Sequence, residues 1–163
     1  MKTKELTLYA LLISAAMILS YVESLLPVFA AVPGVKAGFA NIVIIFALYK
    51  MGNKAAVLIS LLRIFLSSLL FGNMFAMAYS IAGAILSLST MIFLKNTNKL
   101  SIITVSIVGA VMHNLGQTVV AVFVLQTKGL MYYMAPLTLS GVCAGALIGI
   151  AAALVTERIK LSI

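Results

Sequence analysis

Long apolar runs alternate with short polar connections along most of this chain. A helix that crosses the hydrocarbon core of a bilayer needs about 20 apolar residues, and several of the runs approach or exceed that length. Turn signals separate the runs, the clearest being the polar segment KNTNK at 95–99. The pattern predicts six transmembrane helices, the second of them short for a span, over residues 6–26, 37–49, 55–71, 74–94, 101–125 and 134–155.

The composition agrees with an integral membrane protein. Of the 163 residues, 64% are hydrophobic and the mean hydropathy is +1.23, which is more apolar surface than a soluble core of this size can bury. We therefore expect an all-α bundle that forms one transmembrane domain over residues 1–163. The single cysteine, Cys143, excludes an internal disulfide and a zinc site of several cysteines, and we expect no bound metal.

The distribution of positive charge predicts the orientation. The net charge is +8, but no basic patch is interleaved with aromatic residues, so we do not expect nucleic-acid binding. Lys and Arg favour the cytoplasmic side, and an inside N-terminus puts eight of them there against two outside, Lys36 and Lys128. Both termini are therefore predicted to be cytoplasmic, and the chain is predicted to be a multi-pass protein of a bacterial cell membrane, the cytoplasmic membrane. The eight are Lys2, Lys4, Lys50, Lys54, Lys95, Lys99, Arg158 and Lys160.

Small residues recur every four positions on three of the predicted helices, the first, the fourth (at 76, 80 and 84) and the sixth. Gly141, Gly145 and Gly149 form such a stripe on the sixth helix, and stripes of this kind allow another backbone to approach closely. The first helix has shorter versions, Ala10 with Ser14 and Ala16 with Ser20. Each stripe indicates either packing within the chain or a surface that docks on a partner.

A polar cluster lies inside the fifth apolar run. The only histidine, His113, lies four residues before Gln117, and Asn114 lies three residues before Gln117. The three side chains can therefore share one face of a helix. Polar groups at membrane depth are costly and usually face a cavity or one another. The cluster therefore predicts either a helix that lines a ligand cavity or an interhelical hydrogen-bond network.

Single charges mark two further runs. Arg63 is near the middle of the third run, where its guanidinium needs an acceptor. Glu23, near the outer end of the first run, is one candidate partner, and an anionic ligand is another. Lys36 and Asn41 follow a Pro-Gly turn at the outer mouth of the second helix, where a helix N-terminus favours anions.

An ordered set of motifs spans nearly the whole chain: Glu23 with Pro27, PGVKAGFAN at 33–41, Arg63 with LFG at 70–72, SIAG at 80–83, HNLGQ at 113–117, and Tyr133 with Pro136. This set resembles the "Gx transporter" family, also labelled heptaprenyl diphosphate synthase component I. That family is similar to the substrate-binding S components of energy-coupling-factor (ECF) transporters.

The resemblance implies a six-helix protein that binds a vitamin, a prenyl-type precursor or a similar small molecule from outside. It also implies docking on a transmembrane T component that carries two ATPases. Ala10, Ser14, Ala16 and Ser20 would form the docking face. The predicted binding set is Glu23, Lys36, Asn41, Arg63, His113, Asn114 and Gln117.

The synthase label disagrees with the composition. Prenyl diphosphate synthases bind magnesium through aspartate-rich motifs, because the leaving diphosphate needs neutralisation. This chain has no Asp and only three Glu, and it has no nucleotide-binding loop. We therefore expect no enzymatic activity and no cofactor, and ATP hydrolysis would come from partners.

Two alternatives remain open at this point. One is a membrane subunit of a flavin- or quinone-linked extracellular electron-transfer assembly, in which His113 and Gln117 hold a quinone head group. The other is an accessory subunit of a soluble prenyl diphosphate synthase.

Overall fold

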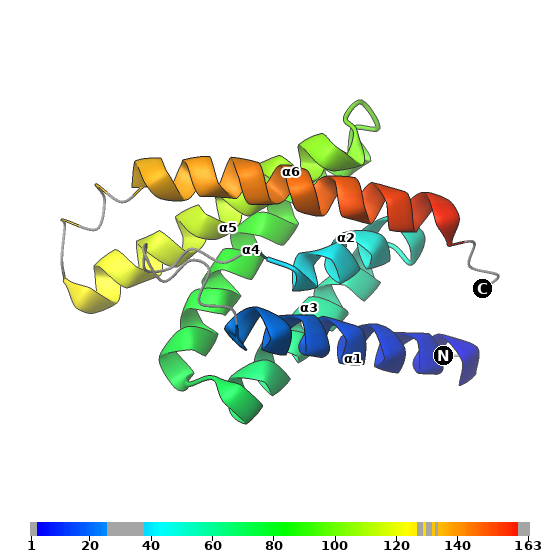
Figure 1. Cartoon of the computed structure of the whole chain (residues 1–163), viewed down its shortest axis with the longest axis horizontal. Coiled ribbons are helices and arrows are strands. Elements are labelled where there is room, and N and C mark those ends of the chain that lie inside the picture. Colours follow the sequence, from blue (N-terminus) through cyan, green and yellow to red (C-terminus); the bar gives the residue numbers. More distant parts are fainter. Residues whose placement is uncertain (1–2, 26–37, 127–128, 130–131, 133, 160–163) are drawn as a thin grey trace.

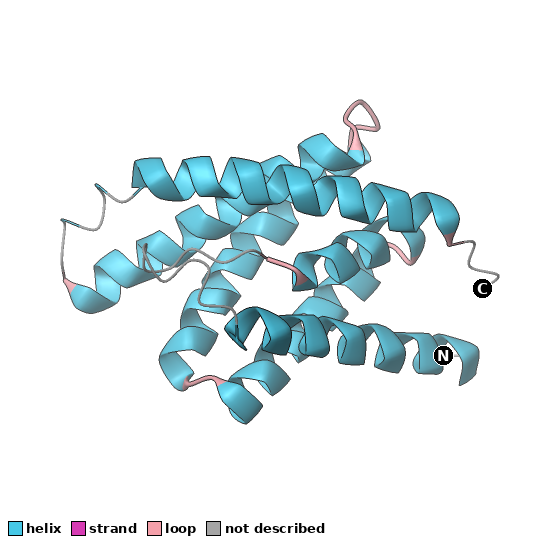
Figure 2. Cartoon of the chain, in the orientation of Figure 1, coloured by secondary structure: helices cyan, strands magenta, loops and turns pink. Residues whose placement is uncertain are grey.

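The computed structural model describes residues 3–25, 38–126, 129, 132 and 134–159, and the secondary structure of this part is helical. Figure 1 and Figure 2 show its helices packed side by side. The predicted all-α, six-helix architecture is confirmed. The helices are α1 (Thr3–Leu25), α2 (Ala40–Lys50), α3 (Asn53–Phe71), α4 (Met74–Asn96), α5 (Ile102–Leu125) and α6 (Met134–Arg158).

Five of these helices are long and apolar enough to cross a membrane, and α2 is the exception. At a rise of about 1.5 Å per residue, the 11 residues of α2 cover roughly half of the ~30 Å hydrocarbon core. Several helices extend beyond their predicted apolar runs. Thus α1 begins at Thr3 and α6 ends at Arg158, since polar residues at the membrane surface still form good helical turns.

The short helix α2 is the centre of the fold. All side chains from Val43 to Leu48 are buried, and α2 contacts α1, α3 and α6. A helix that is apolar on every side is expected to be enclosed in this way. At its C-terminal end, the Lys95 ammonium of α4 donates hydrogen bonds to the Leu48 carbonyl (2.7 Å) and to Asn53 Oδ1 (3.2 Å).

Close backbone contacts join α4, α5 and α6. A Cβ atom added at Gly145 would lie 2.7 Å from Ile107 Cα, and one at Gly149 would lie 2.8 Å from Ile103 Cα. At Gly116 the same atom would lie 2.7 Å from the Ala82 carbonyl oxygen. The glycine stripe of α6 therefore packs against α5 within the chain, and glycine is required because a side chain would separate the helices.

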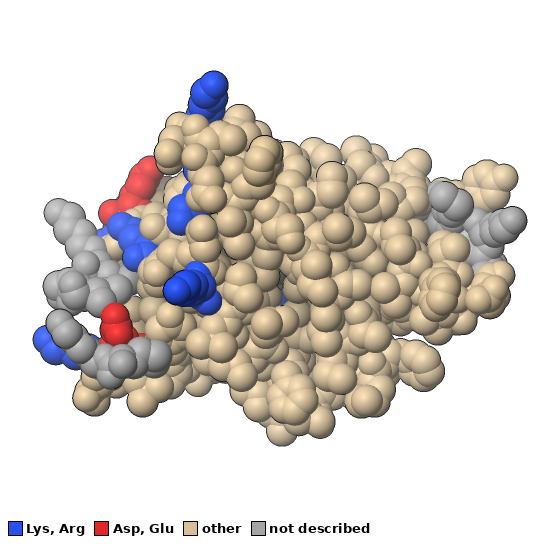
Figure 3. All heavy atoms as spheres, turned by 180° about the vertical axis from the view of Figure 1, so that it is seen from behind, with Lys and Arg blue, Asp and Glu red and all other residues tan. Residues whose placement is uncertain are grey.

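Both ends of the described chain lie at the same end of the bundle (Figure 1), as the predicted topology requires. Charged side chains gather at one end of the face shown in Figure 3, and uncharged residues make up the rest of it. Large apolar side chains are exposed along the helices, for example Leu11 and Ile18 on α1 and Leu147 on α6. Such an apolar girdle is expected of a surface that faces lipid.

Candidate functional site

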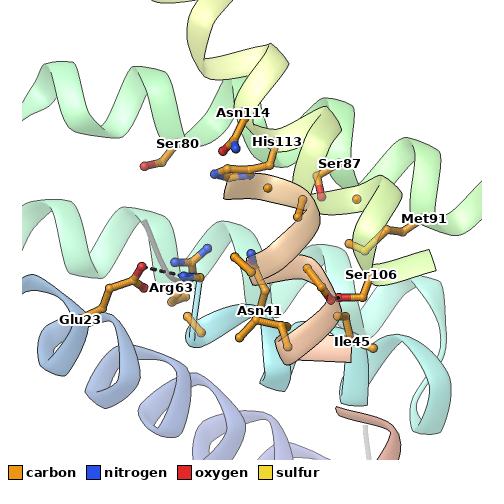
Figure 4. Close-up of a pocket in the computed structure, with 18 residues that line it drawn as sticks. Glu23, Asn41, Ile45, Arg63, Ser80, Ser87, Met91, Ser106, His113 and Asn114 are labelled. Atoms are coloured by element: carbon orange, nitrogen blue, oxygen red, sulfur yellow. Dashed lines mark hydrogen bonds between the residues drawn. The ribbon is translucent and has the colours of Figure 1, made fainter. Parts of the chain in front are cut away.

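A cavity of about 70 Å³ lies between the α1–α3 and α4–α6 groups. Residues from all six helices line it, together with Gly38, which precedes α2. Its apolar wall includes Ile45, Met91 and Ile148, and its polar wall includes hydroxyl groups of α4 and α5. Figure 4 shows that polar side chains from opposite helices point toward this space. The predicted binding residues that line it are Glu23, Asn41, Arg63, His113 and Asn114.

Glu23 ties the outer end of α1 to the start of α2. Its Oε1 accepts a hydrogen bond of 2.6 Å from the backbone N–H of Gly38. Gly38 has a positive φ of 79°, a conformation that glycine adopts at little cost. Its carbonyl in turn accepts a bond from the N–H of Asn41. A carboxylate at this position also complements the positive end of the α2 dipole.

Arg63 points from α3 toward α1 and the cavity (Figure 4). Its Nη1 donates to Ser20 Oγ at 3.2 Å, and its charge attracts the Glu23 carboxylate. Its Nε is buried without a hydrogen-bond partner, and so is Ser67 Oγ one helical turn later. A guanidinium has five N–H donors, so this group retains unused capacity to donate to an acceptor.

The imidazole of His113 lies directly against Gly83 of α4. A Cβ atom added at Gly83 would be 2.8 to 3.0 Å from three atoms of the ring, closer than carbon atoms approach. The absence of a side chain at position 83 therefore lets the ring occupy this place beside the cavity. The sequence singled out His113, but it did not show which helix the ring would pack against.

Asn114 agrees with both interpretations of the polar cluster, a ligand cavity and an interhelical hydrogen-bond network. Its Nδ2 donates a 2.8 Å hydrogen bond to the Leu137 carbonyl of α6, which is an interhelical bond of the structural kind. The same residue lines the cavity. A Cβ atom at Gly141 would lie 2.9 Å from Nδ2, so this glycine makes room for the amide.

Two predicted binding residues remain, Gln117 and Lys36. Gln117 is partly buried on α5, one turn beyond His113, but it does not line the cavity. Lys36 lies outside the described residues. The cluster predicted from spacing therefore divides, because Gln117 lies about 6 Å further along the helix axis than His113, beyond the last α5 residues that line the cavity.

The predicted docking residues also divide. Ala10 and Ser14 are exposed on α1, where Ser14 Oγ donates to the Ala10 carbonyl at 2.9 Å. Ala16 is fully buried, and Ser20 accepts the bond from Arg63. Only Ala10 and Ser14 thus lie on a surface that a partner could reach in this conformation.

Sequence reasoning missed the contribution of α4 to the cavity. Ser80 and Ser87 line it, and Gly83 supports His113. A single hydroxyl or glycine in an apolar run is common in membrane helices and carries little signal alone. Ser106, by contrast, donates to the Gly145 carbonyl at 2.7 Å, so its hydroxyl is used in helix packing.

Comparison with known proteins identifies the family. A family model described as "Heptaprenyl diphosphate synthase component I" matches residues 12–155. No curated protein and no solved structure matches the chain. The matched range begins within α1, ends within α6 and contains the cavity residues from all six helices. The chain therefore belongs to the heptaprenyl diphosphate synthase component I family, in agreement with the resemblance seen in its motifs.

Proposed function

We propose that this chain is the membrane-embedded binding subunit of an uptake system for a small organic molecule and that it works like an ECF S component. The observation that carries the proposal is the cavity, because polar groups from α1, α2, α3 and α5 converge on it inside an otherwise apolar bundle. Maintaining such groups at membrane depth costs free energy, and ligand binding would offset that cost.

The ligand would enter from outside. Glu23 lies near the end of α1, and Asn41 lies in the first turn of α2, which the predicted topology puts toward the outer surface. Among the described residues, the start of α1 at Thr3 and the end of α6 at Arg158 belong to the opposite end. This arrangement supports capture on the outer side and release toward the cytoplasm.

Transport would need partners. The sequence contains no nucleotide-binding loop, so ATP hydrolysis is assigned to separate ATPase subunits joined through a T component. The exposed Ala10 and Ser14 of α1 are the proposed contact with that component, since small residues permit close helix approach. The proposal gives the chain no catalytic role, and it treats "synthase component" as a label of the family.

The first experiment is native mass spectrometry of the detergent-purified chain, followed by organic extraction of any bound molecule. A stoichiometric small molecule that is lost in Asn41→Ala and His113→Ala but kept in Gln117→Ala would support the proposal. Gln117 is the matched control for His113, because it is a polar residue of α5 that does not line the cavity. An empty protein that copurifies only with a soluble Asp-rich synthase would contradict it. A bound quinone without ATPase partners would favour the electron-transfer alternative instead.

A further inference from the structure

The cavity ends in an apolar floor on the side that the predicted topology turns toward the cytoplasm. Its lining residues nearest that side include Ile45 of α2, Met91 of α4 and Ile148 of α6, and all three are buried. Figure 4 shows Ile45 and Met91 on the side of the pocket away from Glu23. A Cβ atom added at Gly109 would lie 2.6 Å from Met91 Sδ. The flexible thioether side chain therefore fills the space that this glycine leaves, as methionine does in irregular gaps.

One helical turn beyond this floor, Lys95 joins α4 to α2 and to the start of α3. Lys95 follows Met91 by four residues on α4, and Leu48 follows Ile45 by three on α2, a step of about 4.5–6 Å along each helix axis. The Lys95 ammonium donates hydrogen bonds to the Leu48 carbonyl at 2.7 Å and to Asn53 Oδ1 at 3.2 Å. These two bonds, which we call the Lys95 bridge, therefore lie between the floor and the predicted cytoplasmic surface.

The Lys95 bridge crosses a seam between α2 and α4 that has little backbone contact. The close neighbours of α2 are α1, α3 and α6, and α4 is not among them. The Lys95 ammonium lies 5.7 Å from the centre of the Tyr49 ring, and the unpaired carbonyls at the C-terminus of a helix such as α2 attract a cation. At the level of the floor, α5 and α6 meet at Gly149, where an added Cβ atom would lie 2.8 Å from Ile103 Cα. An opening in the floor is therefore expected between α2 and α4.

From these observations we propose that the Lys95 bridge closes the cytoplasmic side of the cavity, and that its opening creates a release route between α2 and α4. The proposal deepens the proposed function, on which it rests for the direction of release. Lys95 is only partly buried, so water can replace its two acceptors when α2 and α4 separate. Met91 can then leave the floor by rotation of its unbranched side chain. A lysine that the charge distribution assigned to the membrane surface thus has a second role.

Access of a small ion to a thiol placed just inside the floor tests the proposal on the full chain in membranes. Ser87 is buried and lines the cavity one turn before Met91, so Ser87→Cys puts a thiol of similar size there, and Cys143→Ala removes the native thiol. Inside-out vesicles in chloride-free buffer present the predicted cytoplasmic side to Ag⁺, a soft ion that binds thiolates. The cavity of about 70 Å³ has room for such an ion, since it exceeds the space of a single water. Maleimide labelling after denaturation counts the thiols that remain free.

With Lys95 intact, the Ser87→Cys thiol should react slowly with Ag⁺ from the cytoplasmic side. Lys95→Met should accelerate the reaction at least about tenfold, the factor that corresponds to the loss of one charge-assisted hydrogen bond. Asn53→Ala should accelerate it less, because the Leu48 carbonyl still accepts from the ammonium. Lys99→Met is the matched control, since it removes the same charge from an exposed position in the connection after α4, and it should leave the rate unchanged.

Three results would overturn the proposal. Fast reaction of Ser87→Cys with Lys95 intact would show that the cytoplasmic side is already open. An unchanged rate in folded Lys95→Met would show that the bridge does not close it. Equal acceleration at a second reporter, Thr118→Cys, which is buried on α5 and does not line the cavity, would show general loosening of the bundle. Should Lys95→Met not fold, the rate in Asn53→Ala decides. The assay needs no ligand, so a protein that binds nothing in native mass spectrometry would refute the proposed function separately from the bridge.

Discussion

The helices α4, α5 and α6 meet through backbone contacts, whereas α1, α2 and α3 are linked near the cavity by charged and polar side chains. In the first group, glycines at positions 116, 145 and 149 allow approaches at which a Cβ would lie under 3 Å from neighbouring backbone. In the second group, Glu23 reaches Gly38 and Arg63 reaches Ser20. Backbone contacts tolerate no added atoms, while long side chains can adjust. The comparison predicts that α4–α6 resist added side-chain atoms at these glycines, whereas the polar side-chain links of α1–α3 near the cavity can adjust. We call these the rigid group and the adaptable group.

The largest expected effect comes from breaking the rigid group. Gly145→Val would place a branched side chain where Cβ alone lies 2.7 Å from Ile107 Cα. Overpacking of this kind costs typically about 1–3 kcal/mol and more where the neighbour is backbone, so we expect loss of most folded protein. Size-exclusion chromatography and thermal unfolding in detergent would measure it. Ala78→Val, on an exposed position of α4, is the control and should fold normally. If both variants behave alike, the rigidity of α5–α6 packing is refuted.

An intermediate effect is expected from the charged pair of the adaptable group. Arg63→Met leaves Glu23 without its nearby positive charge. Because Arg63 is only partly buried, we expect a loss of about 2 kcal/mol, below the 3–5 kcal/mol of a fully buried pair. The double variant Glu23→Gln with Arg63→Met should recover part of this loss, since no lone charge remains. Unfolding of the four proteins in a double-mutant cycle measures the coupling, and strict additivity would contradict a charge interaction.

A smaller effect is expected within the α4–α6 group, at Gly83, whose close neighbour is the side chain of His113 beside the cavity. Gly83→Ala should displace the His113 ring, because the new Cβ would lie 2.8 Å from Cε1. The ring is at the end of a side chain and can move, so the cost should be about 1 kcal/mol or less. The NMR signals of the His113 imidazole, recorded on protein labelled at its single histidine, should nevertheless shift clearly. In His113→Ala, the added substitution Gly83→Ala should cost nothing further. A cost that persists without the ring would show that Gly83 serves helix packing alone.

The smallest effect on stability is expected on the exposed face of α1, which points away from the other helices. Ser14→Leu changes an exposed residue, and surface substitutions usually alter stability by less than about 0.5 kcal/mol. If Ala10 and Ser14 contact a T component, however, the bulky side chain should abolish copurification with that component. Leu11→Phe, on a neighbouring exposed position, provides a control of similar bulk. Equal recovery of partner by both variants and wild type would remove this face from the proposed interface.

The positions of the helices followed from local properties of the chain. Apolar length and charged ends specify where a membrane helix begins and ends, and these are visible residue by residue. The glycine stripe of α6 predicted a close contact for the same reason, because its spacing of four repeats on one face. Their polar character at membrane depth also singled out Arg63 and His113, and both line the cavity.

The partners of those residues were decided by tertiary structure. Nothing local distinguishes Gln117, which does not line the cavity, from Asn114, which does, and nothing in α1 shows that Ser20 faces Arg63 while Ser14 is exposed. In a soluble protein, an apolar stripe would reveal the inward face of each helix. Here lipid is as apolar as the interior, so both faces carry similar residues. The rotation of each helix, and with it the composition of the cavity, is therefore determined by packing between residues far apart in sequence.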